Sequence, residues 1–403
     1  MSRRAGLIAL FSADVISVLG NRVSMVAIPW LVLQTTGSAA KMGLIAGAEM
    51  LPYVVSGVLA APFADRFGLR RTSILTDVGS TFAMVAIAAW THASFLQLVL
   101  LVAIAGTLRG LGDRVKHVML KPMADAAGVR MIRVTSAYEG FTKGATLIGA
   151  PLGGLMILWF GANGAIWIDA VSFAVCAALI ATLVRPPAAA EQPEREPYLT
   201  ALRGGFAYLR SDRLLLGMIA MIFVLNVLNQ AGTAVYVPLW VNEVFGSPAE
   251  LGVVFGGFAA GALLGNVAFT FLAPKLPRVP ALFLGAALGA SPRLLVLGLT
   301  DRLWLVVVVS FLCGVAMASV NPVMGVMLYE RVPAALQTRV FGVTGAIAFI
   351  GIPIGGVLAG WSVAWLGLRP ASLAMGVLLL VATVVPLLRV RGTAAAEIEE
   401  PAA

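Results

Sequence analysis

Long apolar runs separated by short polar or basic stretches make up most of the chain. A helix needs about 20 mostly apolar residues to cross the hydrocarbon core of a bilayer. Only helices and closed barrels satisfy their backbone hydrogen bonds in lipid, and barrel strands are shorter and alternate in polarity. The pattern therefore predicts an all-α integral membrane protein with twelve transmembrane helices. We expect them at residues 7–33, 43–63, 72–91, 95–118, 133–158, 162–184, 214–240, 250–273, 279–299, 302–328, 339–362 and 369–388.

The composition agrees with a membrane protein and excludes several other classes. Hydrophobic residues make up 60% of the 403 residues, charged residues make up 12%, and the mean hydropathy is +0.95. These values exclude a soluble enzyme, a disordered chain and a nucleic-acid-binding module. The histidines and cysteines form no cluster with metal-ligand spacing, so we expect no metal site.

The basic residues predict the orientation in the membrane. If the N-terminus lies inside, the lysines and arginines gather in or beside the inner connecting segments, whereas the outer segments carry only Lys41, Arg302 and Arg369. Cytoplasmic loops of membrane proteins accumulate lysine and arginine, which also accounts for the net charge of +9. We therefore expect a multi-pass protein of the cytoplasmic membrane with both termini in the cytoplasm.

The two halves of the sequence repeat each other. Residues 28–45 align with 237–254, and residues 147–155 align with 349–357. A duplicated six-helix unit is typical of secondary transporters, whose substrate sites lie at the interface of the repeats near the middle of the membrane. We expect two six-helix halves related by pseudo-two-fold symmetry. The glycines and prolines that match are Pro29 with Pro238, Gly43 with Gly252, Gly149 with Gly351, Pro151 with Pro353, Gly153 with Gly355 and Gly154 with Gly356.

A polar segment separates the halves. Its leucine and phenylalanine residues recur at helical spacing, which predicts an amphipathic helix on the inner membrane surface, with a plain solvated linker as the alternative. These residues are Leu199, Leu202, Phe206 and Leu209. The expected domains are an N-terminal bundle (1–184), a cytoplasmic linker (185–213), a C-terminal bundle (214–390) and a disordered cytoplasmic tail (391–403).

Several local motifs resemble those of one transporter family. The segment ADRFGLRR (64–71), the arginine Arg109 and the segment GAPLGG (149–154) resemble motifs of the major facilitator superfamily. The segments WIDAVSF (167–173) and YERVPAALQTRVFG (329–342) are similar to its branch of enterobactin and macrolide exporters. The sequence departs from the family at Ala61 and Leu69, where a glycine and a basic residue are usual, and in the displaced proline of GAPLGG. The resemblance implies the family's twelve-helix fold and a monomer.

The resemblance also implies roles for two motifs. One is a loop that latches the two halves together in one of their alternating states, and its residues are Asp65, Arg66, Gly68 and Arg70. The other is an antiporter motif whose small residues let helices pack closely, and its residues are Gly149, Pro151, Gly153 and Gly154. The alternatives are a loop that only sets topology and a static packing motif. We expect Asp77 to anchor Arg70 or Arg71.

Ionisable residues within the predicted helices are candidates for proton coupling. A charge at the middle of a membrane costs at least about 2.5–3.5 kcal/mol, so such side chains face partners or water. We expect Arg109 to pair with Asp113, and Glu139 with Lys143, because each pair is four residues apart on a helix. Our hypothesis is that a carboxylate, Glu139 or Asp113 above all, binds a proton in one conformation and a cationic side chain in the other. A permanent ion-pair network is the alternative. The proton-coupling candidates are Asp14, Asp113, Glu139 and Asp169, with Arg22, Arg109 and Lys143 as charge partners.

Substrate contacts are expected from polar side chains in helices that line the centre of the family fold. The second half has few charged residues in its helices and offers amide and hydroxyl groups instead. We expect Arg293 to pack or to reach toward the membrane surface rather than to bind substrate. The candidates for substrate binding are Asn21, Asn226, Asn229, Gln230, Tyr236 and Asn321.

Together these features predict a secondary active transporter rather than an enzyme. We expect it to export a small amphipathic compound, a drug-like molecule or siderophore, by alternating access against inward proton flow. The expected partners are that compound and membrane lipid, without nucleic acid and with no cofactor beyond the proton gradient. An importer or uniporter of a metabolite on the same fold is the first alternative. A non-transporting membrane sensor or membrane enzyme is the second.

Overall fold

The computed structural model of the chain describes residues 3–89, 94–187, 198–333 and 336–399. The described part is built from helices and their connections and contains no strand. Ten of its helices are long and apolar enough to cross a membrane. This part of the chain therefore forms the all-helical membrane protein that the sequence predicts.

The first half contains five helices, one of them sharply bent. They are α1 (Arg3–Thr36), α2 (Ala39–Phe67), α3 (Leu69–Ala89), α4 (Phe95–Ala126) and α5 (Met131–Leu183). Gly161 bends α5, because its φ of 71° and ψ of 171° lie outside the helical region and suit a residue without a Cβ atom. The two arms of α5 correspond to the predicted spans 133–158 and 162–184.

The second half is more interrupted. It contains α6 (Tyr198–Ser211), α7 (Arg213–Ala231), the π-helix η1 (Gly232–Tyr236), α8 (Val237–Val244), α9 (Ala249–Leu272), the 3-10 helix η2 (Ala273–Lys275), α10 (Arg278–Leu299), α11 (Leu303–Met317), α12 (Val320–Arg331), α13 (Gln337–Leu366) and α14 (Leu368–Glu399). The segments α7, η1 and α8 form one rod that corresponds to the predicted span 214–240, and α11 with α12 corresponds to 302–328. Each predicted span thus has a helical counterpart.

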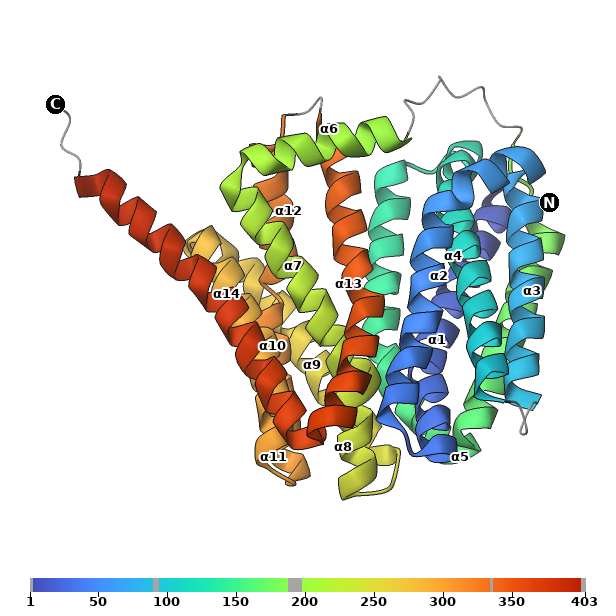
Figure 1. Cartoon of the computed structure of the whole chain (residues 1–403). Helices are drawn as coiled ribbons and strands as arrows, with labels where there is room; N and C mark the ends of the chain where they lie inside the picture. The colour runs from blue at the N-terminus through green and yellow to red at the C-terminus, as the bar shows by residue number, and fades with distance from the viewer. Residues whose placement is uncertain (1–2, 90–93, 188–197, 334–335, 400–403) are drawn as a thin grey trace.

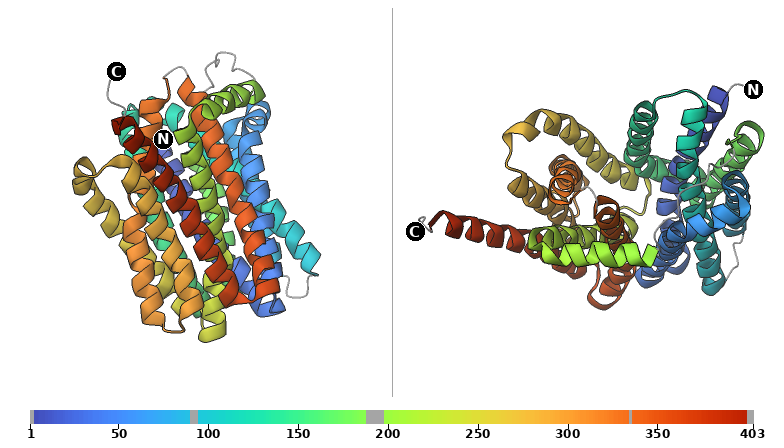
Figure 2. Two further views of the ribbon diagram at one scale, coloured as in Figure 1. Left: turned by 60° about the vertical axis from the view of Figure 1, so that its left-hand side comes forward. Right: turned by 90° about the horizontal axis from the view of Figure 1, so that it is seen from above.

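The two halves stand side by side and differ in how closely they approach along their length. Both chain termini and α6 lie at one end of the molecule, which we call the terminal end (Figure 1). The halves contact each other through α2 with α13 and through α5 with α9. They converge toward the opposite end, called the far end, and spread apart toward the terminal end (Figure 1). The view from above shows the two halves side by side (Figure 2).

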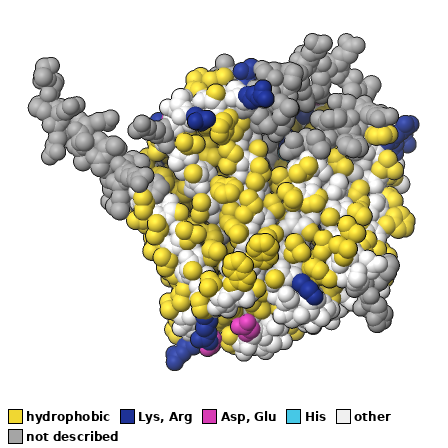
Figure 3. Space-filling model, in the orientation of Figure 1, with side chains coloured by type: hydrophobic (Ala, Val, Ile, Leu, Met, Phe, Trp, Pro, Cys, Tyr) yellow, Lys and Arg dark blue, Asp and Glu magenta, His cyan; other side chains and the backbone are white. Residues whose placement is uncertain are grey.

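The surface agrees with a membrane environment. Hydrophobic side chains cover the face shown in Figure 3, and the charged side chains on that face lie mostly near its two ends. Large hydrophobic residues such as Phe82, Phe271 and Trp365 are exposed. A soluble protein rarely exposes so broad an apolar surface, whereas lipid solvates it without penalty.

The linker helix forms as predicted and packs on the second half. In α6, a Cβ atom on Gly205 would lie 2.6 Å from the carbonyl oxygen of Arg339, so the helix crosses α13 closely. The Tyr208 hydroxyl donates to the Arg331 carbonyl at 2.7 Å. Leu209 is buried, Phe206 is exposed, and the side chains of Leu199 and Leu202 lie outside the described residues.

The helix α14 extends into the tail, and the expected disorder of residues 391–403 stays a prediction. Residues 391–399 continue α14 to Glu399, because the segment is rich in alanine and glutamate, which have high helix propensity. Residues 400–403 lie outside the described part of the chain.

Candidate functional site

A buried ion pair joins two helices of the first half. The Arg109 guanidinium of α4 binds the Glu49 carboxylate of α2, and both side chains are only 3% exposed. Arg109 also donates to the carbonyl oxygen of Asn21 on α1, at 3.2 Å. One arginine therefore connects three helices in the interior of the first half.

This geometry corrects the expected pairing of Arg109 with Asp113. The α2 backbone approaches α4 closely because glycines face it: a Cβ atom on Gly106 would overlap the carbonyl oxygen of Glu49. Glu49 is thereby brought to the guanidinium from a neighbouring helix. Asp113 instead accepts a hydrogen bond from the Tyr53 hydroxyl at 3.2 Å.

The sequence reasoning missed Glu49, although a signal was present. Glu49 is a single acid within the predicted span 43–63, which is the same criterion that selected Asp14 and Asp169. Lys116 likewise falls in the predicted span 95–118 and is absent from the candidates for proton coupling and charge pairing. A uniform search of every span for ionisable residues would have found both.

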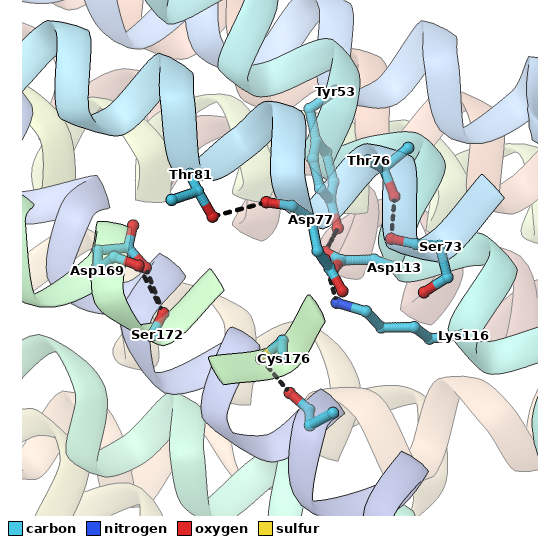
Figure 4. Close-up of polar contacts among 11 residues, drawn as sticks. Tyr53, Ser73, Thr76, Asp77, Thr81, Asp113, Lys116, Asp169, Ser172 and Cys176 are labelled. Atoms are coloured by element: carbon cyan, nitrogen blue, oxygen red, sulfur yellow. Dashed lines mark hydrogen bonds and ion pairs between the residues drawn. The ribbon is translucent and has the colours of Figure 1, made fainter. Parts of the chain in front are cut away.

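A second buried ion pair lies within the first half. Lys116 of α4 donates to the Oδ1 atom of Asp77 of α3 at 2.7 Å, and both side chains are almost fully buried (Figure 4). Asp14 of α1 is buried within electrostatic range of Lys116 and Asp113. The Oδ2 atoms of Asp14 and Asp77 have no hydrogen-bond partner among the described residues. This group therefore holds acidic oxygens able to accept further protons or donors.

The Asp77 contact overturns its expected role as an anchor for Arg70 or Arg71. Arg70 donates instead to the carbonyl oxygens of Ile180 and Ala181 near the end of α5, through Nε at 3.4 Å and through Nη2. The positively charged side chain meets carbonyl groups at the negative end of a helix, which stabilises both. Arg70 therefore ties the α2–α3 connection to its own half.

The rest of the proposed latch is described only in part. Gly68 has a φ of 81°, and a Cβ atom there would meet nothing within 4 Å, so the turn depends on the backbone freedom of glycine. The side chains of Asp65 and Arg66 lie outside the described residues. A latch between the halves stays a prediction.

Asp169 is fully buried on the second arm of α5 and accepts hydrogen bonds from two hydroxyl groups. One comes from Ser24 of α1. The other comes from Ser172, whose Oγ lies 3.0 Å from Oδ1 (Figure 4). Gly20 makes room for the carboxylate, because a Cβ atom there would overlap Asp169 Oδ1. Arg22 of α1 lies within electrostatic range of Tyr53, Arg109 and Asp113. The side chains of Glu139 and Lys143, the other expected pair, lie outside the described residues.

The glycine motif of α5 contacts both its own half and the other half. A Cβ atom on Gly149 would overlap the Arg22 side chain of α1, and one on Gly153 would lie 3.4 Å from Val23. Gly154 faces α9, where its Cβ atom would lie 2.5 Å from the Gly252 nitrogen, and a Cβ atom on Gly252 would lie 3.1 Å from the Pro151 carbonyl oxygen. The motif therefore forms part of the contact between the halves.

The matching motif of α13 makes the corresponding contacts. Gly355 approaches the α7 backbone at Val227, while a Cβ atom on Gly43 of α2 would overlap the carbonyl oxygen of Gly356. Gly43 matches Gly252 in the sequence repeat, and Gly356 matches Gly154. The α5 motif thus contacts Gly252 of α9, and the α13 motif contacts the matching Gly43 of α2, so the two contacts between the halves repeat each other.

Glycines nearer the terminal end behave differently. Cβ atoms on Gly140 and Gly144 of α5, or on Gly342 and Gly345 of α13, would meet nothing within 4 Å. Phe141, between the first two, is 55% exposed. At these four positions α5 and α13 therefore have no close neighbour among the described residues, unlike the glycines near the far end.

Two of the expected substrate residues are engaged in helix packing. Asn226 donates to the carbonyl oxygen of Ala348 on α13 at 2.9 Å. Tyr236 is fully buried in η1, and its hydroxyl lies 2.7 Å from Ser362 Oγ. Tyr236 faces no open space in this conformation, because the π-helical turn packs against α1, α2 and α13. Asn226 is half-buried.

The other expected substrate residues are more accessible. Asn229 and Asn321 are exposed and Gln230 is half-buried. Asn21 is buried, and its Oδ1 atom has no hydrogen-bond partner among the described residues. These four retain polar atoms able to bind a ligand.

Comparison with known proteins agrees with this architecture. The family model of the Major Facilitator Superfamily matches residues 10–246 and 219–402. The multidrug efflux pump Tap of Mycobacterium tuberculosis is 29% identical over 384 residues, which cover 93% of this chain and 91% of that protein. Macrolide efflux protein A of Streptococcus pyogenes is 22% identical over 404 residues, which cover 94% of this chain and 95% of that protein.

Solved structures share the fold. The nucleoside transporter NupG has a TM-score of 0.78 at 12% identity, covering 94% of this chain and 97% of that chain. A bacterial homologue of the lysosomal transporter Spinster, inward-facing and unoccupied, has a TM-score of 0.73 at 17% identity, covering 95% of each chain. At these identities the likeness concerns the fold alone.

Proposed function

Because the chain belongs to the Major Facilitator Superfamily, we propose that it exports small amphipathic compounds, such as drug-like molecules or siderophores, in exchange for protons. It is a multi-pass membrane transporter and not an enzyme. The similarity to a multidrug efflux pump and to a macrolide efflux protein supports export. The buried ion pair between Arg109 and Glu49 is the observation that carries the proton-coupled mechanism.

We place the terminal end in the cytoplasm. The distribution of lysine and arginine supports this orientation in the cytoplasmic membrane. The halves contact each other at the far end through Gly43 with Gly356 and Gly154 with Gly252. With this orientation the halves would open toward the cytoplasm, the state in which an exporter takes up its cargo.

Alternating access then follows from the paired glycine contacts. Small residues allow the backbones of α2 and α13, and of α5 and α9, to touch and to slide without interlocking side chains. A rocking motion of the two halves would separate them at the far end, where these contacts lie. It would bring together the portions of α5 and α13 that now carry uncontacted glycines. Transporters of this architecture move largely as two rigid bundles around a central site.

Proton coupling is proposed to work through exchange of the arginine partner. Arg109 is held by Glu49 in this conformation, with Asp113 and Asp169 within electrostatic range. A proton that neutralises Glu49 would release the guanidinium to another carboxylate. Glu49 therefore joins the carboxylates proposed from the sequence, which are Asp14, Asp113, Glu139 and Asp169.

The substrate is proposed to bind between the halves near these groups. Asn21, Asn229, Gln230 and Asn321 supply amide groups that a drug-like molecule can contact. The proposal requires membrane lipid and a proton gradient but no further cofactor. It requires one chain, because both halves of the transport path belong to it.

Vesicle transport with defined probes tests this function. Purified protein in proteoliposomes, supplied with ethidium or erythromycin and an imposed pH gradient, should accumulate the probe, and an ionophore should abolish the accumulation. Glu49→Gln should lower pH-driven accumulation by about tenfold or more while leaving exchange without a gradient measurable. The double variant Glu139→Gln with Asp113→Asn tests the carboxylates favoured by the sequence in the same way.

The exposed Glu330 supplies a matched control. Glu330 pairs with Arg278, and both side chains are about half exposed. Glu330→Gln should transport like the wild type. Normal pH-driven accumulation in Glu49→Gln would rule out the partner exchange proposed for Arg109. Accumulation in intact cells that an ionophore does not raise would favour the importer or uniporter instead of export.

A further inference from the structure

One buried arginine in the second half lacks an acidic partner. Arg293 of α10 is 5% exposed, and its Nε and Nη2 atoms have no hydrogen-bond partner among the described residues. Its guanidinium lies over the rings of Phe255 and Phe258 of α9, with Cζ 5.5 and 4.8 Å from the ring centroids. Aromatic faces stabilise a cation, but they leave its N–H groups able to donate hydrogen bonds.

The lack of a counter-charge distinguishes Arg293 from the buried cations of the first half. Arg109 is paired with Glu49 and Lys116 with Asp77. The ion pairs described in the second half lie at exposed or partly exposed positions: Arg278 with Glu330, Arg331 with Asp212 and Arg369 with Asp301. An uncompensated charge within a membrane protein is costly and marks a functional site by default. Of the two alternatives expected from the sequence, Arg293 packs on aromatic rings, and its burial argues against a side chain that reaches toward the membrane surface.

A small cavity adjoins Arg293. It lies between α7, α10 and α14 and is lined by Arg293, Asn229, Gly232 and Gly289 together with apolar side chains. The two glycines supply no side chains to fill it. Asn229 is exposed, so the cavity reaches the surface of the described protein at a residue with amide donors. Its size suits about one water molecule or one small group.

We propose that Arg293 and Asn229 form a binding site for a small anionic group. The guanidinium matches the planar geometry of a carboxylate and also binds compact anions. The group would be either a free chloride ion or the carboxylate of a transported compound, which share this chemistry. The site goes beyond the proposed export function, because anion binding can be measured without transport.

Thermal unfolding of the purified full-length protein tests the site. Wild-type protein in detergent is compared in 100 mM potassium chloride, potassium acetate and potassium HEPES, whose bulky sulfonate does not fit the cavity. Chloride or acetate should raise the Tm by roughly 2–4 °C relative to HEPES. Arg293→Gln should abolish the rise, whereas Arg302→Gln, which removes an exposed arginine from the nearby α10–α11 connection, should retain it.

The pattern of shifts identifies the source of the anion. A shift with chloride assigns a free ion, and a shift with acetate alone assigns the carboxylate of a compound. No shift in the wild type, or the same shift in Arg293→Gln, overturns the proposal. Because Arg293→Gln can fail to fold, Asn229→Ala serves as a second variant, and an unchanged shift in it also overturns the proposal. If the wild type does not transport ethidium but chloride or acetate still raises its Tm, the result counts against export and not against this site.

Discussion

At the scale of the residue, the first half differs from the second in how its buried charges are neutralised. Arg109 and Lys116 each meet a carboxylate from a neighbouring helix, whereas Arg293 meets aromatic rings. Removing one member of a buried pair leaves the other charge uncompensated, which costs about 3–5 kcal/mol. The effect of replacing Arg109 therefore depends on whether Glu49 is still present, and the reverse also holds.

A double-mutant cycle should reveal this coupling between Arg109 and Glu49. Arg109→Gln and Glu49→Gln should each lower the Tm, and the double variant should be more stable than the sum of the two losses predicts. The measurement is thermal unfolding of purified protein at constant pH and lipid. Asp301 and Arg369, an exposed pair, provide the control cycle, in which we expect coupling of less than about 1 kcal/mol. Strictly additive losses for Arg109 and Glu49 would show that the two side chains are not coupled.

At the scale of the element, glycines decide which helix faces approach each other. Gly43, Gly154, Gly252 and Gly356 bring backbones of opposite halves into contact at the far end. Gly205 does the same where α6 crosses α13. The repeat in the sequence identifies the first four residues, but it does not indicate that they contact each other. That contact follows from the packing of helices from different halves.

A larger side chain at the far-end contact should shift the conformation. Gly43→Val would overlap the Gly356 carbonyl, so it should disfavour this state and lower maleimide labelling of an introduced Phe141→Cys, an exposed position beside the uncontacted Gly140 of α5. The native Cys176 and Cys313 are buried and supply little background. Gly342→Val is the matched control, because it meets open space in this state and should preserve labelling. Equal labelling in both variants would contradict the role of the glycine contact.

The crossing of α6 over α13 should also depend on a glycine. A Cβ atom on Gly205 would lie 2.6 Å from the Arg339 carbonyl oxygen and 2.8 Å from Val343, so Gly205→Val should destabilise the protein by about 1–3 kcal/mol. Thermal unfolding measures the loss. Gly217→Ala on α7 meets nothing within 4 Å and should leave the Tm unchanged or raise it slightly, because alanine favours a helix over glycine. Tolerance of Gly205→Val would mean that α6 does not pack on α13 as described.

At the scale of the whole molecule, the distribution of apolar and charged residues on the surface matches a lipid bilayer. An apolar surface covers the sides, and charged residues lie mostly near the ends (Figure 3). The halves touch at one end and diverge at the other (Figure 1). This asymmetry is what an alternating-access transporter requires, because a path open at both ends would leak.

Cysteine labelling tests the orientation of the whole molecule. Arg302→Cys and Lys275→Cys place single cysteines at exposed positions in the connections at either end of α10. An impermeant maleimide should label Arg302→Cys in intact cells and Lys275→Cys only in inverted vesicles. The reverse pattern would place the termini outside and make the described conformation outward-open.

The sequence by itself determined the helical spans, the internal repeat and the family resemblance, because these depend on local polarity and on residue types at fixed spacing. It also selected most of the buried ionisable residues, since a charge in an apolar run is visible without any structure. Only the tertiary structure decided their partners: Glu49 for Arg109, Lys116 for Asp77, and aromatic rings for Arg293. The physical reason is that several neighbouring helices could supply a partner for a buried side chain. Which of them comes close enough is fixed by packing between segments far apart in the chain.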